Sequence, residues 1–225
     1  MRYAVEFGLV ALGAAMMGAG LPGGAQAQEI GPQAGPWTVE ASGGIAVPVA
    51  SLEDLEKAGP AARLGLAHWF TPRAAVRVDA SADFLKGRAA TDPGILVGPV
   101  PDMTLWSYLG GVELRITPPD ASTFDLTANL EAGATTMHSK DSPVFAENGY
   151  AGPNFSHTFF TGAAGLRAAY WVTPRIDLFV DGQADLIATS NAATRELAPF
   201  SSTVDAGGFE GALAFPIEAG LKLVI

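Results

Sequence analysis

The sequence predicts an all-β fold, an eight-stranded antiparallel up-and-down transmembrane β-barrel with short periplasmic turns and long extracellular loops. Three observations predict it. Apolar and polar residues alternate in eight segments, which is the period of a strand with two different faces. Short turns built around Thr-Pro alternate with long connections rich in Gly, Pro, Asn and Ser. Most of the segments have about the 9–11 residues that a tilted strand needs to cross a bilayer.

The composition is unusual for a soluble enzyme. Of the 225 residues, 48% are apolar and only 16% are charged, whereas about 25% charged is usual. The net charge of −10 argues against nucleic acid as a partner, because nucleic-acid binding needs clustered positive charge. The chain contains no cysteine, which excludes disulfides, thiol catalysis and zinc held by cysteine.

The N-terminal segment is predicted to be a cleavable signal peptide, residues 1–27. A weakly basic start at Met1–Tyr3 precedes an apolar stretch from Gly8 to Leu21, and Ala25-Gln26-Ala27 has the A-x-A pattern of a cleavage site. The alternative is an ordinary buried or membrane-anchoring helix. Cleavage would leave residues 28–225 as an outer-membrane β-barrel domain, in which no apolar run reaches the roughly 18–20 residues of a transmembrane helix.

Each predicted strand places apolar side chains on one face and polar side chains on the other. In Ala74–Phe84, for example, Val76 and Val78 alternate with Arg77 and Asp79. The last segment is expected to close the barrel against the first. The eight predicted strands are Trp37–Val49, Ala61–Phe70, Ala74–Phe84, Trp106–Ile116, Phe124–Ala134, Phe160–Val172, Ile176–Leu186 and Leu213–Ile225.

Short and long connections alternate along the chain. Three tight reversals are predicted where Pro follows Thr, because Pro fixes φ near −65° at a turn corner: Thr71-Pro72-Arg73, Thr117-Pro118-Pro119-Asp120 and Thr173-Pro174-Arg175. The long connections cover roughly residues 50–60, 87–103, 138–157 and 189–208. Two hairpins also resemble each other, since Ala62–Asp83 and Ala164–Asp185 match at 11 of 22 positions without a gap.

Alternation alone does not say which face meets lipid, and a soluble lipocalin-like barrel would have the same period with an apolar lumen. Aromatic residues at the segment ends and the asymmetry between short turns and long loops favour an apolar face toward lipid. The interior of an eight-stranded barrel is only wide enough for side chains, so we expect opposite charges to fill it. The expected lumen charge network is Arg77, Asp79, Glu113, Arg115, Glu131, Arg167, Asp181, Glu218 and Lys222.

Two stretches, Leu64–Val78 and Gly165–Leu178, resemble the hairpins of small opacity/OmpA-type outer-membrane barrels. In each, an apolar strand ends near an aromatic residue, turns at Thr-Pro and continues as an alternating strand. The resemblance implies a place in the bacterial outer membrane, contact with outer-membrane lipids and lipopolysaccharide, and insertion by the barrel-assembly machinery. The chain departs from the family at Ile225, because the family usually ends in Phe.

The sequence contains no P-loop, dinucleotide-binding fingerprint or HExxH motif. His138-Ser139, near Asp141 and Glu147, is the one pair that suggests a hydrolase, but adjacent residues of a strand point to opposite faces. The positions of His138 and His157 also place them on opposite faces, which disfavours a metal site. We therefore expect no catalytic residue, no cofactor and no metal.

These observations favour a non-enzymatic barrel that serves envelope integrity or surface adhesion through its extracellular loops. In the third long loop, Phe145, Tyr150 and Phe155 are possible contacts for a surface partner, although they can equally pack the loop onto the rim. A narrow porin-like channel for small solutes or ions is an alternative that single-channel conductance would reveal. A lipid A-type hydrolase is a further alternative, which would lose activity in His138→Ala.

Thiol labelling tests the predicted topology. In this cysteine-free chain, Gly149→Cys lies in a predicted extracellular loop and Asp120→Cys lies in a predicted periplasmic turn. A membrane-impermeant thiol reagent applied to intact cells is expected to label only the first. Lysed cells, in which both cysteines should react, provide the control. Labelling of Asp120→Cys in intact cells would contradict the topology.

Overall fold

The computed structural model describes residues 37–49, 52–53, 56–87, 102–118, 123–139, 155–189 and 211–225. The predicted signal peptide, most of the four long connections, and Phe145 and Tyr150 lie outside the described residues. Within the described part of the chain, no helix is long and apolar enough to cross a membrane.

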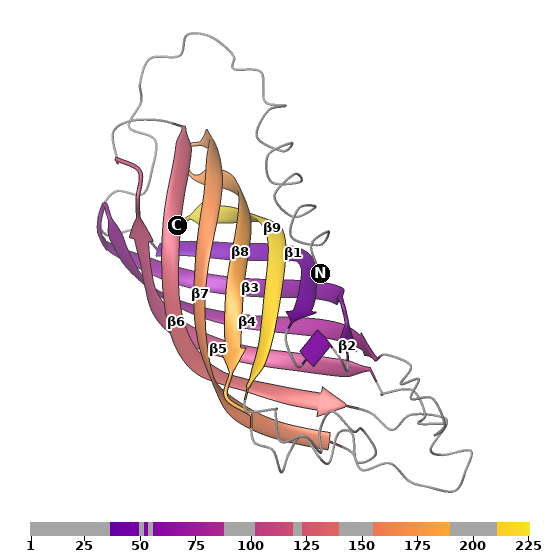
Figure 1. Ribbon diagram of the computed structural model, residues 1–225. Helices are drawn as coiled ribbons and strands as arrows, with labels where there is room; N and C mark the ends of the chain where they lie inside the picture. The colour runs from indigo at the N-terminus through magenta and orange to yellow at the C-terminus, as the bar shows by residue number, and fades with distance from the viewer. Residues whose placement is uncertain are drawn as a thin grey trace, which may run out of the picture.

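Eight long strands form a closed antiparallel barrel. Each pairs with its neighbour along the chain, and the ring closes where β1 pairs with β9. Figure 1 shows β6 to β9 crossing in front of β1, β3 and β4 at a steep angle, as tilted strands on opposite walls of a barrel do. The strands are β1 (Trp37–Val49), β3 (Gly59–Thr71), β4 (Ala74–Gly87), β5 (Met103–Arg115), β6 (Phe124–Ser139), β7 (Phe155–Thr173), β8 (Ile176–Ile187) and β9 (Ala212–Val224).

The predicted eight-stranded antiparallel barrel and all eight predicted strands are confirmed, but some predicted strand ends are wrong. β6 continues to Ser139 and β7 begins at Phe155, and these two residues pair directly. Phe155 therefore lies in a strand and not in the loop that the sequence predicts. The error arises because polar residues here follow one another on both faces, whereas the backbone ladder continues. The two-residue strand β2 (Glu56–Lys57), which pairs with the end of β4, was also not predicted.

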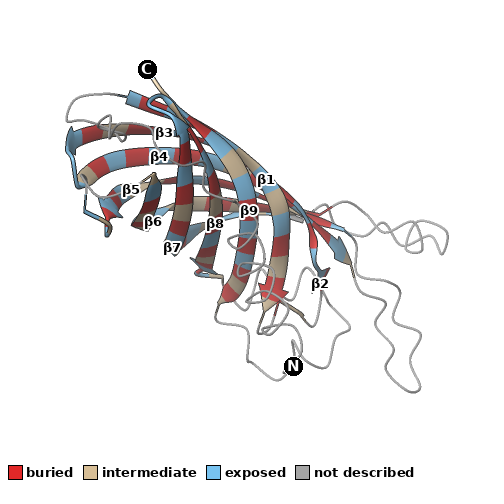
Figure 2. Ribbon diagram, turned by 90° about the horizontal axis from the view of Figure 1, so that it is seen from above, coloured by how far each residue is buried: buried red, intermediate tan, exposed pale blue. Residues whose placement is uncertain are grey.

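Alternation along each strand separates an apolar exterior from a polar interior. Figure 2 shows buried and exposed bands succeeding one another along the strands. Val78, Leu130 and Leu178 point outward, with 57%, 65% and 51% of their surfaces exposed, whereas the charged residues between them are buried. Because hydrocarbon offers no hydrogen-bond partner, a closed ring of paired strands is the form of β-sheet that can face it.

The two similar hairpins share a turn with the same chemistry. In each, the backbone N–H of the Arg after Pro donates to the Oγ1 of the Thr before it, Arg73 to Thr71 and Arg175 to Thr173, both at 3.2 Å. Each turn follows a register shift, between Trp69 and Thr71 in one hairpin and at the matching place in the other. The Thr-Pro-Arg repeat therefore encodes a two-residue turn in which the Thr hydroxyl accepts the hydrogen bond of the Arg backbone N–H. We call the end of the barrel with these turns the turn end, and the opposite end the loop end.

Glycine is required where the strands bend closely around the small interior. Gly133 of β6 has the inward position, and a Cβ added there would overlap the carbonyl oxygen of Tyr108 on β5. Glycine within a strand marks such bends and close backbone approaches. In contrast, Gly162 of β7 has the outward position, and no atom lies within 4 Å of a Cβ built on it.

Replacing these two glycines separates backbone crowding from ordinary glycine flexibility. Gly133→Ala is expected to lower the free energy of unfolding by about 1–3 kcal/mol, because the added methyl group must displace the Tyr108 carbonyl. Gly162→Ala is the matched control, and we expect its free energy of unfolding to be unchanged or raised by up to about 1 kcal/mol. Urea unfolding in lipid vesicles, followed by tryptophan fluorescence, measures both. Equal losses in the two variants would contradict the assignment.

Candidate functional site

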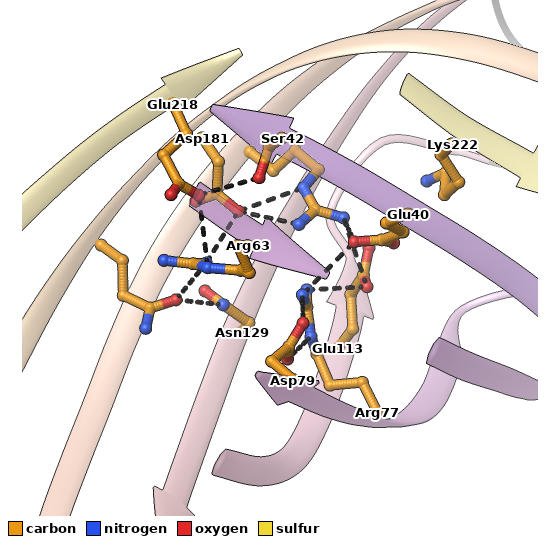
Figure 3. Close-up of polar contacts among 12 residues, drawn as sticks. Glu40, Ser42, Arg63, Arg77, Asp79, Glu113, Asn129, Asp181, Glu218 and Lys222 are labelled. Atoms are coloured by element: carbon orange, nitrogen blue, oxygen red, sulfur yellow. Dashed lines mark hydrogen bonds and ion pairs between the residues drawn. The ribbon is translucent and has the colours of Figure 1, made fainter. Parts of the chain in front are cut away.

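The interior of the barrel contains a network of buried ion pairs around three arginines. Arg77 on β4 lies at its centre. Its guanidinium donates two hydrogen bonds of 2.7 Å to the carboxylate of Asp79 and one of 3.2 Å to Glu113. It also forms ion pairs with Glu40 at 3.3 Å and with Glu131 at 3.1 Å. Arg77 thereby joins carboxylates from β1, β4, β5 and β6. Figure 3 shows three of them, Glu40, Asp79 and Glu113, around its guanidinium.

Arg167 on β7 extends the network to the opposite wall. Its guanidinium donates to Glu40 at 2.7 Å and to Asp181 at 2.8 Å, and it stacks over the Phe179 ring at 4.2 Å. Glu40 thus accepts from both Arg77 and Arg167. Because a buried charge is tolerated only when it is paired, Glu40 couples two arginines that approach from different strands.

Arg63 on β3 occupies the third position of this central network. Its guanidinium donates to the side-chain oxygen of Gln183 at 2.8 Å and forms ion pairs with Glu218 at 3.3 Å and Asp181 at 3.6 Å (Figure 3). Asn129 adds an amide link between Glu131 and Gln183, with hydrogen bonds of 2.7 and 3.0 Å. Side chains from β1 and from β3 to β9 therefore meet across the lumen.

Aromatic residues and cations fill the interior at the turn end. Lys222 is completely buried, pairs with Asp177 at 3.0 Å and lies over the rings of Trp69 and Trp171. Arg115 pairs with Asp125 at 2.8 Å, and its guanidinium also lies over Trp69, at 5.1 Å. Cations above indole rings gain electrostatic stabilisation in such desolvated places.

At the loop end the interior becomes apolar. A cluster of buried side chains, the apolar lid, lies beyond the central network, and partly buried Phe159 packs against it. Its members come from seven strands and from Leu52 in the segment before β2. The apolar lid consists of Ala46, Leu52, Ala61, Leu85, Met103, Leu105, Met137, Ile187, Ala212 and Ala214.

Glu56 on β2 is a buried carboxyl group at the loop end. It is 0% exposed, and neither of its side-chain oxygens has a hydrogen-bond partner among the described residues. β2 pairs with the last two residues of β4, beside the exposed ion pair between Lys86 and Asp102, so Glu56 lies outside the membrane-crossing part of the strands. Burial and the negative charge of Asp102 raise the pKa of Glu56 from 4.5 to about 8.

All nine residues of the predicted charge network are buried inside the barrel. Seven belong to the central network, whereas Arg115 and Lys222 form the separate turn-end pairs. The sequence analysis did not single out Glu40, Arg63 or the partners Asp125 and Asp177. Their positions on the polar faces of strands were visible, but the cross-strand partners were not.

The histidines and Ser139 do not form a site. His138 faces outward, whereas its neighbour Ser139 faces inward and is buried. His157 pairs with Met137, so it lies on the opposite face of the sheet from His138. Among the described residues, no group of three or more His, Asp or Glu side chains is arranged as ligands of a metal ion.

The fold is that of small bacterial outer-membrane β-barrels. The chain's sequence matches no protein-family model and no curated protein. Its structure is similar to that of outer membrane protein OprG from Pseudomonas aeruginosa, with a TM-score of 0.56 and 13% identity over 87% of this chain and 98% of that one. Neisserial surface protein A has a TM-score of 0.55 and 13% identity, covering 83% and 96% of the two chains. Ail, the attachment invasion locus protein of Yersinia pestis, has a TM-score of 0.50 and 12% identity, covering 86% and 100%.

Removing the central guanidinium tests how much the network contributes to stability. Arg77→Met is expected to lower the free energy of unfolding by about 3–5 kcal/mol, because it leaves several buried carboxylates without their cation. Lys86→Met is the matched control, since the Lys86–Asp102 pair is more than half exposed on both sides and such pairs contribute about 0–1 kcal/mol. Urea unfolding in lipid vesicles gives both values. A loss in Arg77→Met as small as that in Lys86→Met would contradict a stabilising network.

The buried Glu56 predicts a pH dependence of stability. Its folded pKa of about 8 exceeds the ordinary value of 4.5, so the folded state binds the proton more tightly than the unfolded state. The stability that this group contributes is complete below pH 4.5 and is lost as the pH rises through 8. Glu56→Gln is expected to flatten this decline in the thermal midpoint, whereas Glu53→Gln, at a partly exposed neighbour, should retain it. Parallel curves for Glu56→Gln and the wild type would refute the assignment.

Proposed function

We propose that this chain is a non-enzymatic β-barrel of the bacterial outer membrane that serves envelope integrity or surface interaction through its extracellular loops. The observation that carries the proposal is the filled interior. The central network, the turn-end cations and the apolar lid occupy successive levels of the lumen. A lumen filled in this way favours a structural or surface role over transport, so the loops are the parts available to a partner.

The exterior supports the membrane location. Large apolar side chains are exposed on all eight long strands, and a soluble protein rarely leaves so large an apolar surface exposed to water. Aromatic residues lie near both ends of the strands, including Trp37 at the turn end and Trp106 nearer the loop end, as in the interfacial girdles of barrels. We infer export by the cleavable signal peptide at 1–27, insertion by the barrel-assembly machinery, and contact with outer-membrane lipids and lipopolysaccharide.

Two of the similar structures favour a role at the cell surface. One is called a surface protein and another an attachment invasion locus protein. The same role would place the aromatic residues of the third loop, Phe145 and Tyr150, where a partner can reach them. Ser139 and Phe155 pair directly at the base of this loop, so the paired strands extend to the point where the loop begins.

A loop replacement tests the surface role. Because Ser139 and Phe155 are directly opposite, an Asn-Gly turn can replace residues 140–154 without changing the register. In a deletion strain, the wild-type chain is expected to restore attachment to a cell monolayer. The shortened chain should still show the heat-dependent gel mobility of a folded barrel. Cells that carry it should still exclude a hydrophobic dye but should no longer attach to the monolayer.

Two results would overturn the proposal. One is recovery of the mature wild-type protein in a soluble periplasmic extract. The other is regular single-channel conductance of the purified protein in planar bilayers, which would instead favour the narrow channel. Retention of full attachment by the shortened chain would remove the third loop from the proposed contact.

A further inference from the structure

The barrel interior contains twice as many carboxylates as cations. In the eight long strands, the buried cations are Arg63, Arg77, Arg115, Arg167 and Lys222, and the buried carboxylates are Glu40, Asp79, Asp83, Glu113, Asp125, Glu131, Asp177, Asp181, Asp185 and Glu218. At the turn end, Arg115 and Lys222 each have one carboxylate partner. The excess negative charge therefore lies nearer the loop end. Unpaired charge in a low-dielectric interior is costly and calls for a compensating cation.

Five inward oxygen-bearing side chains follow one another around half of the barrel. We call them the oxygen arc: Asp83 on β4, Ser107 on β5, Thr135 on β6, Thr161 on β7 and Asp185 on β8. All five are buried, with exposures of 0–3%. The three hydroxyls form a chain, in which Thr161 donates to Thr135 at 2.7 Å and Thr135 contacts Ser107 at 2.8 Å. A carboxylate stands at each end of this chain.

The register places the oxygen arc at one height of the barrel. Residues that pair directly from one strand to the next form a row around the ring, and because the strands are tilted this row moves toward the loop end. The row that starts at Asp79, in the middle of β4, reaches Ile187, the last residue of β8. Along the arc, three of the four steps move two residues toward the turn end, and the step from Ser107 to Thr135 follows the row directly. These displacements toward the turn end cancel the shift toward the loop end that strand tilt causes, so the five side chains stay at a similar height.

The two terminal carboxylates face each other across the lumen with little compensation. β4 and β8 are four strands apart in either direction around the ring, so the inward side chains of Asp83 and Asp185 lie on opposite walls of the lumen. The Oδ1 atom of Asp83 is buried without a hydrogen-bond partner, and within the described ranges no ion pair reaches this side chain. Asp185 accepts one hydrogen bond, from the Gln183 amide at 2.7 Å. The nearby Arg63 makes its own ion pairs with Glu218 and Asp181.

We propose that the oxygen arc holds a divalent metal cation, with calcium as the ion that fits it best. Two facing carboxylates match the charge of a divalent ion, and calcium accepts 6–8 oxygen ligands in flexible geometry. Asp83 and Asp185 would provide the charge, and hydroxyls of the arc and water would complete the shell. Among the described residues no group of three or more His, Asp or Glu side chains is arranged as metal ligands, so this site would depend on only two carboxylates. The apolar lid lies beyond it, which makes the ion a resident of the fold.

Metal retention by the refolded full barrel tests the proposal. The wild-type chain is folded into detergent micelles with calcium chloride, with magnesium chloride or with a chelator, then desalted. We expect one equivalent of calcium to remain bound after desalting. We also expect the thermal midpoint, read from heat-dependent gel mobility, to rise by roughly 5 °C or more with calcium. Magnesium should do less, because it demands near-ideal octahedral geometry.

Substitution of the two terminal carboxylates gives the decisive comparison. Asp83→Asn with Asp185→Asn should abolish calcium retention and yet melt at or above the wild-type temperature in chelator, because the repulsion is removed; a merely structural pair would melt lower in both conditions. Asp83→Asn alone serves if the double variant does not fold. Asp102→Asn, at an exposed carboxylate outside the barrel, is the control and should retain calcium.

Three results would overturn the proposal. The first is a wild-type barrel that retains no calcium, and the second is equal retention by the double variant. The third is a pair of results: the double variant has a higher thermal midpoint than the wild type in chelator, and calcium does not change the thermal midpoint of the wild type. That outcome would mean that protons neutralise the carboxylates. None of these results bears on whether the loops bind a surface partner.

Discussion

Closure of the backbone hydrogen-bond ring between β1 and β9 is the constraint on which the rest of the structure depends. Hydrocarbon satisfies no N–H or C=O group, so a sheet in lipid must have no free edge. Once the ring closes, the two-residue period of each strand divides its side chains between lipid and lumen. The eight strands leave an interior that side chains can fill, and the charges that cannot face lipid are collected there. Pairing among these charges then becomes a requirement, because an unpaired charge in the interior is more costly than in water.

The polarity of the interior changes along the barrel, and the sequence carries a signal for that change. At the turn end and in the middle, the inward positions carry charges and amides. At the loop end Leu85 follows Phe84, and Ile187 follows Leu186, so both faces become apolar there. These doublets mark the apolar lid, which the sequence analysis missed because it counted only the outward apolar positions. An apolar closure at the loop end keeps water away from the ion pairs below it, which strengthens them.

The strands were predictable and the contacts between distant strands were not, for a physical reason. Alternation is local, so it placed Arg77 and Glu131 on the same face as their neighbours without reference to the rest of the chain. The partners of Arg63 and Glu40 depend on the stagger between strands, which is a property of the closed ring. For the same reason, the opposition of Asp83 and Asp185 could not be read from either strand. The wrong ends of β6 and β7 reflect polar residues that weaken the periodic signal while the backbone ladder continues.

The resemblance between the two hairpins extends over half of the barrel. In both copies the register continues into the next two strands: Val78 pairs with Gly110 as Val180 pairs with Ala219, and Gly111 pairs with Glu131 as Gly220 pairs with Ser42. The strands β3 to β6 thus correspond in their pairing to β7, β8, β9 and β1. A Cβ at Gly44 would overlap the carbonyl of Ile217, in the place equivalent to that of Gly133.

The two pairings that join these halves, the seams of β6 with β7 and of β1 with β3, differ in register. At one seam Leu130 pairs with Ala164, whereas at the other Ala41, the counterpart of Leu130, pairs with Leu64, two positions beyond the counterpart of Ala164. The symmetry is therefore broken at the joins and preserved within each half. Lys222 is unmatched too, since its counterpart is Glu113, a residue of opposite sign. The two halves therefore differ where they join and at Lys222, whose ammonium group lies over the rings of both Trp69 and Trp171.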